Sequence, residues 1–300
     1  MKKVLIALAV LLSAGIFFSC GGNDRQGGAE NSKDRVFKFS AISDQNQSGL
    51  ELRNKAIADY LAKELGVKVE YVPVKGYDAT VTAFKKDEVQ LGWFGGYTGL
   101  LAIRAVPGSK AIAQGEDDPN FQSYLIANVK NTGLNLTKEF PKDLKKYSFT
   151  FGSTLSTSGR LMPEYFIRKE NGDVAPKEVF KSVAFQKNHD EVITAVEAGT
   201  FDIGAVNYKK FNARVKKDPT LLERVRIIWK TPGYQDYNWT IRGDVDKKFG
   251  EGFTEKVQKA IVELKDEKIL EMMKRSNFIK TDNKMFENIE KTAKELKLID

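Results

Sequence analysis

Short apolar strands alternate with amphipathic helices along the first third of the chain. Residues 36–42 alternate between apolar and polar positions as a half-buried strand does, and Val67–Val74 and Val89–Phe94 continue the series. Helical spacing of apolar positions fills the gaps, from Leu50 to Leu65 and from Ala79 to Lys86. A β-α-β-α-β order predicts a parallel, doubly wound sheet whose ligands lie beyond the carboxyl ends of the strands.

The same alternation resumes after residue 119. Further strands are predicted at Gln122–Val129, 149–151, Val179–Phe185, 201–207, Val225–Trp229 and Tyr237–Ile241, and further helices at Leu136–Lys146, from the 156–163 region to Glu170, Glu191–Ala198, Thr254–Met273 and Lys284–Leu296. We expect Tyr237–Ile241 to rejoin the first sheet. The pattern therefore predicts an α/β protein with two doubly wound lobes joined by a two-strand hinge: residues 36–119 plus 237–300, and residues 120–236.

The N-terminus has the pattern of an export signal. Met1-Lys2-Lys3 precedes an apolar run, Val4–Phe18, which is shorter than a membrane-spanning helix requires. We predict a signal peptide over residues 1–19 and acylation of Cys20, the only cysteine of the chain, with residues 20–35 as a flexible linker. The alternative is an inert Cys20 with no cleavage, or with cleavage elsewhere.

Charge and composition exclude several classes of function. The formal charge is +8, but basic and acidic residues are interspersed, which indicates a soluble surface and no nucleic-acid partner. The single histidine, His189, leaves no His/Cys metal cluster, and no cofactor-binding motif is present. Hydrolysis is disfavoured because no Gly-x-Ser-x-Gly element surrounds Ser158. The lysine pairs, including Lys209-Lys210, are interpreted as solvated helix faces.

The clearest chemical signal is a strand, a hydroxyl-rich turn and a helix in succession. Phe149–Phe151 is followed by Gly152 and then by Ser156-Thr157-Ser158, with Pro163 in the first turns of a helix. Hydroxyls and free N–H groups at the positive end of a helix form an anion site in outline. An ordinary serine-capped helix is the alternative.

Three other positions lie where a cleft is expected. His189 follows a strand of the second lobe, which makes a ligand contact as reasonable as a buried structural role. Tyr77 follows Gly76 in a loop of the first lobe, and a cleft-lining role is at least as well supported as a core role. Asn207 comes directly after a strand and can donate to an anion.

Several blocks of the sequence together resemble the phosphonate-binding lipoproteins and periplasmic proteins of ABC importers, over about residues 36–280. The blocks are Gly76-Tyr77-Asp78, Leu91-Gly92-Trp93-Phe94-Gly95, Thr150-Phe151-Gly152 with Ser156-Thr157-Ser158-Gly159, His189-Asp190, and Asp202-Ile203-Gly204-Ala205-Val206-Asn207. The resemblance implies a type II-like periplasmic binding protein that is no enzyme, holds a small oxyanion between its lobes and delivers it to a permease in the inner membrane. We expect an exported, lipid-anchored monomer facing the periplasm or the cell exterior.

The resemblance also implies which residues contact the ligand. They are Ser156, Thr157, Ser158, Tyr77, Phe94, His189, Asp190 and Asn207. Phe94 stands where relatives often have Tyr, and Asn207 stands near a place where some have Asp. Phosphonate or phosphite is the first expectation. Selenate, selenite or another oxyanion is the alternative, because Trp93-Phe94-Gly95-Gly96 and residues 231–237 resemble a branch proposed to carry selenium oxyanions. A surface scaffold or adhesin lipoprotein without a transport ligand is the alternative from another class.

Overall fold

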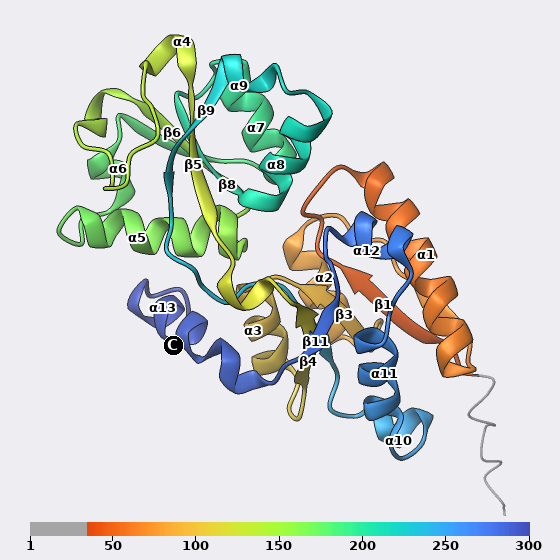
Figure 1. Ribbon diagram of the computed structural model, residues 1–300. Coiled ribbons are helices and arrows are strands. Elements are labelled where there is room, and N and C mark those ends of the chain that lie inside the picture. Colours follow the sequence, from red (N-terminus) through yellow and green to blue (C-terminus); the bar gives the residue numbers. More distant parts are fainter. Residues whose placement is uncertain (1–34) are drawn as a thin grey trace, which may run out of the picture. The chain divides into compact units, whose positions relative to one another are not determined.

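The computed structural model describes residues 35–300, and their strands form two separate sheets (Figure 1). The first sheet has the strand order β11-β4-β10-β3-β1-β2, and the second has the order β7-β6-β8-β5-β9. The strands of the first sheet are β1 (Phe37–Ala41), β2 (Val69–Tyr71), β3 (Leu91–Phe94), β4 (Lys110–Gly115), β10 (Asn238–Ile241) and β11 (Phe278–Lys280). Those of the second are β5 (Ser123–Asn128), β6 (Ser148–Phe151), β7 (Ser182–Phe185), β8 (Ile203–Asn207) and β9 (Val225–Lys230). We call each sheet, with its helices, the first and the second lobe.

The helices flank the two sheets (Figure 1). Those of the first lobe are α1 (Gln47–Leu65), α2 (Tyr77–Lys85), α3 (Gly96–Ala105), α10 (Val245–Phe249), α11 (Phe253–Val262), α12 (Glu267–Met273) and α13 (Glu287–Glu295). Those of the second are α4 (Val129–Thr132), α5 (Met162–Glu170), α6 (Pro176–Val179), α7 (His189–Glu197), α8 (Tyr208–Lys217) and α9 (Leu221–Arg224). Single turns complete the set: η2 (Asp118–Asn120), η3 (Leu144–Lys146), η4 (Thr157–Leu161) and η5 (Asn283–Phe286).

Both sheets are mixed, whereas the sequence predicts parallel ones. Strands β2, β1 and β3 are parallel to one another, as are β7, β6 and β8. The strands next to each parallel core run the other way: β10 is antiparallel to β3 and β4, and β5 is antiparallel to β8 and β9. Since β5 and β10 follow the two crossings between the sheets, their direction is set by the path of the chain and not by local periodicity. The predicted return of Tyr237–Ile241 to the first sheet is confirmed by β10.

The two segments that connect the lobes pair with each other. Phe121 and Tyr234 form an antiparallel bridge, in which the Phe121 N–H donates to the Tyr234 carbonyl at 2.8 Å and the Tyr234 N–H donates to the Phe121 carbonyl at 3.0 Å. Two adjacent crossings are the arrangement in which small backbone rotations move one lobe against the other. The α/β fold with two sheets and two crossings is therefore as predicted, and the lobe limits at residues 119/120 and 236/237 stay a prediction.

The predicted helix over Leu136–Lys146 is wrong. Only η3 (Leu144–Lys146) is helical there, and Thr137 instead donates its N–H to the carbonyl of Ile228 in β9 at 3.0 Å. Pro141 disfavours helical backbone at the residue before it, which leaves this segment extended. The single helix predicted over residues 254–273 is two, because Asp266 accepts the Ile269 N–H at 3.0 Å and starts α12 anew. Strands β4 and β11 were not predicted.

The N-terminal predictions fall on residues that the structure does not describe. The predicted signal peptide, Cys20 and the linker up to residue 34 lie outside the described range. Within residues 35–300, none of the helices combines the length and the apolar character needed to span a membrane.

Candidate functional site

The hydroxyl-rich turn joins β6 to α5 and is buried. Ser156, Thr157 and Ser158 are each at most 2% exposed. Ser156 is the N-cap, since its Oγ accepts the Gly159 N–H at 2.9 Å, and the first turn, η4, is a π-helix. Gly159 is required by packing: a Cβ there would lie 2.9 Å from Ser156 Oγ and 3.1 Å from the His189 ring. The turn therefore lies directly beside His189, the first residue of α7. This is expected because the carboxyl ends of neighbouring parallel strands meet at one edge of a sheet.

The Thr157 hydroxyl links the second lobe to the first. Its Oγ1 accepts the backbone N–H of Tyr97, in the first turn of α3, at 2.9 Å. The carbonyl of Ser158 accepts the Ser123 hydroxyl at 2.7 Å. The turn is thus held from both lobes, and it lies on the boundary between them.

Tyr77 and Phe94, the two predicted ligand residues of the first lobe, have different surroundings. Tyr77 begins α2 and is 2% exposed, and its hydroxyl has no hydrogen-bond partner. Burial raises the pKa of Tyr77, the Asp44 carboxylate raises it further, and the nearby Ser156 hydroxyl opposes this. Phe94 ends β3 and is fully buried in the core of the first lobe, where it packs edge-to-face on Phe84 at 5.6 Å between ring centroids.

His189 presents one unpaired ring nitrogen. Its Nδ1 accepts the backbone N–H of Asn207 at 3.4 Å, and Nε2 has no partner although the residue is buried. Burial lowers the pKa of His189 to about 4, which leaves the ring neutral at physiological pH. Because Nδ1 accepts, the ring proton belongs on Nε2, which can then donate to an anion.

Asp190 and Asn207 make contacts that position other groups. Asp190 Oδ2 accepts the Asn46 N–H of the first lobe at 3.0 Å. Asn207 caps α8, since its Oδ1 accepts the N–H groups of Lys209 at 2.8 Å and Lys210 at 3.2 Å. Its amide donates to the Tyr237 hydroxyl at 3.0 Å. In the described contacts Asp190 therefore joins the two lobes, and Asn207 both starts α8 and contacts Tyr237 of the first lobe.

The structure adds a buried charge cluster to the predicted site. Asp44, just beyond β1, is 2% exposed; its Oδ2 lies 3.1 Å from Lys210 Nζ and accepts the Tyr237 hydroxyl at 3.0 Å. Burial alone would raise the pKa of Asp44, but Lys210 and Arg53 outweigh it and hold that pKa low. The interpretation of Lys210 as a solvated residue is wrong, because its side chain is 8% exposed and also donates to Gln45 Oε1.

A second carboxyl lies in the crossing segment that leads back to the first lobe. Asp236 is 1% exposed; its Oδ1 accepts the Gly96 N–H at 3.0 Å, and its Oδ2 has no partner. Burial raises the pKa of Asp236 to about 7. The hydrogen bond from Gly96 and the nearby hydroxyls of Thr157 and Ser158 lower this pKa, but by less than burial raises it. No motif or periodic pattern in the sequence marks Asp236, and only its place in the predicted crossing could have indicated it.

Four of these buried groups each leave one polar side-chain atom unpaired among the described residues: Asp44 Oδ1, Tyr77 Oη, His189 Nε2 and Asp236 Oδ2. Their charges and dipoles perturb one another: the pKa values of Tyr77 and Tyr237 both respond to Asp44 and Asp236, and that of His189 responds to Asp44. Buried polar atoms are nearly always paired, so these four need partners that the described protein contacts do not supply.

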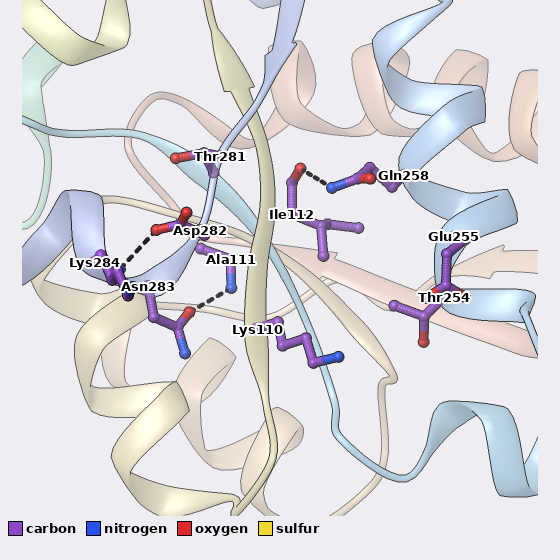
Figure 2. A pocket seen from close by; sticks show the side chains of 10 residues that line it. All are labelled: Lys110, Ala111, Ile112, Thr254, Glu255, Gln258, Thr281, Asp282, Asn283 and Lys284. Atoms are coloured by element: carbon purple, nitrogen blue, oxygen red, sulfur yellow. Dashed lines mark hydrogen bonds between the residues drawn. The ribbon is translucent and has the colours of Figure 1, made fainter.

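Hollows in the surface of the described residues differ in their distance from these groups. One pocket of about 430 Å³ is lined by residues of β4, α11 and the segment from β11 into η5. Its lining side chains, drawn in Figure 2, include none of the predicted ligand residues. Its polar groups cap backbone: Gln258 Nε2 donates to the Ile112 carbonyl at 2.8 Å, and Asn283 Oδ1 accepts the Ala111 N–H at 2.8 Å. A larger hollow of about 1110 Å³ is lined by residues of both lobes, including Asn46, Asp190, Lys210 and Lys274, and borders the charge cluster.

Comparison with known proteins identifies relatives over most of the chain. A family model described as "ABC transporter, phosphonate, periplasmic substrate-binding protein" matches residues 39–286. The chain is 38% identical over 275 residues to the probable ABC transporter phosphite binding protein PhnD1 of Prochlorococcus marinus (strain MIT 9301), covering 89% of this chain and 92% of that protein. It is 24% identical over 203 residues to the phosphonates-binding periplasmic protein of Escherichia coli (strain K12), covering 67% and 59% of the two chains.

Solved structures agree with the sequence relatives. The structure of Prochlorococcus marinus PhnD1 in complex with methylphosphonate has a TM-score of 0.82 and 39% identity, covering 90% of this chain and all of that one. A binding protein component of an ABC phosphonate transporter from Pseudomonas aeruginosa has a TM-score of 0.74 at 20% identity over 86% and 85% of the chains, which shows a shared fold.

Proposed function

The chain belongs to the periplasmic phosphonate substrate-binding proteins of ABC transporters, and we propose that it captures a small oxyanion of the phosphonate and phosphite class between its lobes and delivers it to a membrane permease. The observation that carries this proposal is a pair of buried, unpaired donors beside the Ser156–Ser158 turn, Tyr77 Oη and His189 Nε2. The named ligands of the relatives described above are phosphonate and phosphite, and the selenium alternative gains no support from them.

Neutral donors surround the proposed anion position. The turn supplies hydroxyls and the N-terminal amides of a helix that continues through α5, Tyr77 supplies a phenol, and His189 supplies Nε2–H. Hydrogen bonds to a charged group are worth roughly 1.5–3 kcal/mol each, enough together to offset the lost hydration of a buried anion. Asp190 and Asn207 hold the lobes and the α8 terminus that frame it.

Closure of the lobes is part of the proposed mechanism. Contacts such as Thr157 to Tyr97 and Asp44 to Lys210 join groups from different lobes, and the ligand would add further ones. Two paired crossings would allow the lobes to separate and release the anion at the permease. Export follows from membership in a periplasmic family, and anchoring through an acylated Cys20 is our proposal for how the protein is kept at the membrane.

Calorimetric titration of the mature protein tests the proposal. The probes are methylphosphonate, phosphite, phosphate, sulfate, selenate and selenite, each titrated into protein freed of bound anion by unfolding and refolding. We expect saturable binding at one site per chain, tightest for methylphosphonate or phosphite, with a rise in melting temperature. Absence of saturable binding to all six would favour the scaffold alternative, and a clear preference for selenate or selenite would replace the ligand class.

A further inference from the structure

Asp44 is a carboxylate in a site proposed to bind an anion. Its Oδ2 is fully engaged, by Lys210 Nζ at 3.1 Å and by the Tyr237 hydroxyl at 3.0 Å, while Oδ1 has no partner. The carboxyl is 2% exposed and is linked to His189 by contacts: its Tyr237 partner accepts the Asn207 amide at 3.0 Å, and the Asn207 N–H donates to His189 Nδ1 at 3.4 Å. An unpaired carboxylate oxygen beside an anion requires a hydrogen-bond donor between them.

We infer that Asp44 is a specificity-determining residue of this site: its Oδ1 accepts a hydrogen bond from a protonated oxygen of the ligand, so that the site takes oxyanions that carry a proton and rejects those that carry none. The inference rests on the proposed function and adds the protonation state of the ligand. Near neutral pH, phosphite and alkylphosphonates exist partly as monoanions in which one oxygen carries a proton. Sulfate and selenate are fully ionised and carry no such proton. With the latter, two acceptors would face each other in a buried site, which costs far more than a missing contact.

The groups around Asp44 keep it ionised and thus an obligate acceptor. Those that face or electrostatically influence it are Lys210 on α8, Arg53 on α1, His189 on α7, Tyr77 on α2, Tyr71 on β2, Tyr237 before β10 and Lys274 after α12. Lys210 and Arg53 are both buried, and they compensate its charge without occupying Oδ1. Asp236 differs, because burial raises its pKa to about 7 and it can either accept or donate. Asp44 therefore requires a hydrogen-bond donor on the ligand, whereas Asp236 does not.

The test compares dissociation constants for methylphosphonate and sulfate, by calorimetry at several values from about pH 5.5 to about pH 8.5, which brackets the second ionisation of a phosphoryl group. For the wild type we expect methylphosphonate to bind more tightly than sulfate and to weaken as pH rises. In Asp44→Asn the amide can donate to an unprotonated oxygen. The ratio of the sulfate to the methylphosphonate dissociation constant should fall at least about tenfold, and the pH dependence of methylphosphonate binding should flatten.

Controls separate this role from a structural one. Asp117→Asn also removes a carboxylate that pairs with a lysine, Lys209 Nζ at 2.5 Å, but Asp117 is half exposed and should leave the ratio unchanged. If Asp44→Asn does not fold, the variant Asp44→Asn/Lys210→Gln removes both charges of the buried pair and allows the same comparison.

The outcomes distinguish two failures. If the wild type binds methylphosphonate while Asp44→Asn retains the wild-type ratio and pH profile, or loses both anions equally, the inference about Asp44 is overturned and the proposed function stands. If the wild type prefers sulfate or binds neither anion, the proposed ligand class and the inference both fail.

Discussion

Thr157 and Tyr97 join the two lobes through one hydrogen bond, in which the Tyr97 backbone N–H donates to Thr157 Oγ1 at 2.9 Å. Thr157 belongs to the predicted anion-binding turn of the second lobe, and Tyr97 lies in the first turn of α3 in the first lobe. The acceptor oxygen is engaged, but the hydroxyl proton remains available to a ligand or to Asp236. One side chain can therefore couple ligand binding to closure of the lobes.

Thr157→Val should weaken oxyanion binding about tenfold or more. The substitution keeps the shape of the side chain and removes both the interlobe hydrogen bond and a donor to a charged ligand. The measurement is a calorimetric dissociation constant on folded protein. Thr154→Val, at an exposed position of the same turn, is the matched control and should bind as the wild type does. Equal affinity of Thr157→Val and Thr154→Val would exclude the turn as the site.

Tyr77→Phe should have opposite effects on binding and on stability. Because the buried hydroxyl has no partner, its removal should raise the free energy of unfolding of the anion-free protein by about 1 kcal/mol. The same change removes a donor to the ligand and should weaken binding about tenfold. Urea unfolding and calorimetry measure the two effects, with Tyr165→Phe on α5 as the control. A loss of stability together with unchanged affinity would contradict the assigned role.

His189 should make stability depend on pH in the acid range. Its pKa is lowered by burial from 6.5 to about 4, so between these values the unfolded chain binds a proton that the folded chain does not. The His189 contribution to stability therefore rises with pH across this window, by on the order of 3 kcal/mol in total. Urea unfolding at pH 4 to 7 should show that the free energy of unfolding of the wild type increases relative to that of His189→Asn as pH rises.

Asp236 changes the stability in the opposite direction to His189 over an overlapping pH range. Its pKa is raised by burial from 3.8 to about 7, so the folded chain keeps a proton that the unfolded chain releases. Its contribution is present at low pH and is lost as pH rises toward 7. In Asp236→Asn the unopposed His189 contribution should make the loss of stability on acidification steeper than in the wild type. A pH profile that is parallel in all three proteins would contradict both assignments.

Asp118→Ala should destabilise the protein by about 3–5 kcal/mol. Asp118 receives two hydrogen bonds from Arg275, Nη2 to Oδ1 at 2.7 Å and Nε to Oδ2 at 2.8 Å, and both side chains are at most 5% exposed. The variant would leave the buried Arg275 charge without its carboxylate, with hydrogen bonds only from Nη1 to the Met273 and Lys274 carbonyls. Asp59→Ala breaks the exposed pair with Lys55 and should change stability by less than about 1 kcal/mol. Urea unfolding compares the two, and similar small losses would show that the buried pair adds little.

Cys20→Ala should release the protein from the membrane fraction. Acyl chains supply membrane affinity of about 0.8 kcal/mol per buried CH₂, and Cys20 is the only cysteine that could carry them. Fractionation followed by immunoblotting measures the distribution, with Ser19→Ala as the neighbouring control. Continued membrane association of Cys20→Ala would remove the case for a lipid anchor.

The sequence by itself determined the features that depend on neighbouring residues. Periodicity located β1, β2, β3 and β5 and the helices α1, α2 and α7, and the Ser156 cap marked the start of a helix at a strand end. Because carboxyl ends of parallel strands meet at one edge, the same reasoning placed Tyr77, His189 and the turn near one another. The family resemblance, carried by these short blocks, was confirmed by the family match over residues 39–286.

Only the tertiary structure decided which charges are buried and what they contact. Lys210 lies in a run of polar residues that any surface helix could contain, and its burial against Asp44 joins two lobes distant in sequence. Asp236 follows no periodic pattern, and its raised pKa comes from packing in the crossing segment. The antiparallel strands β5 and β10 likewise depend on the path of the whole chain. Local propensity carries no information on such contacts, because their free energy arises from desolvation and pairing between segments that meet only in the folded protein.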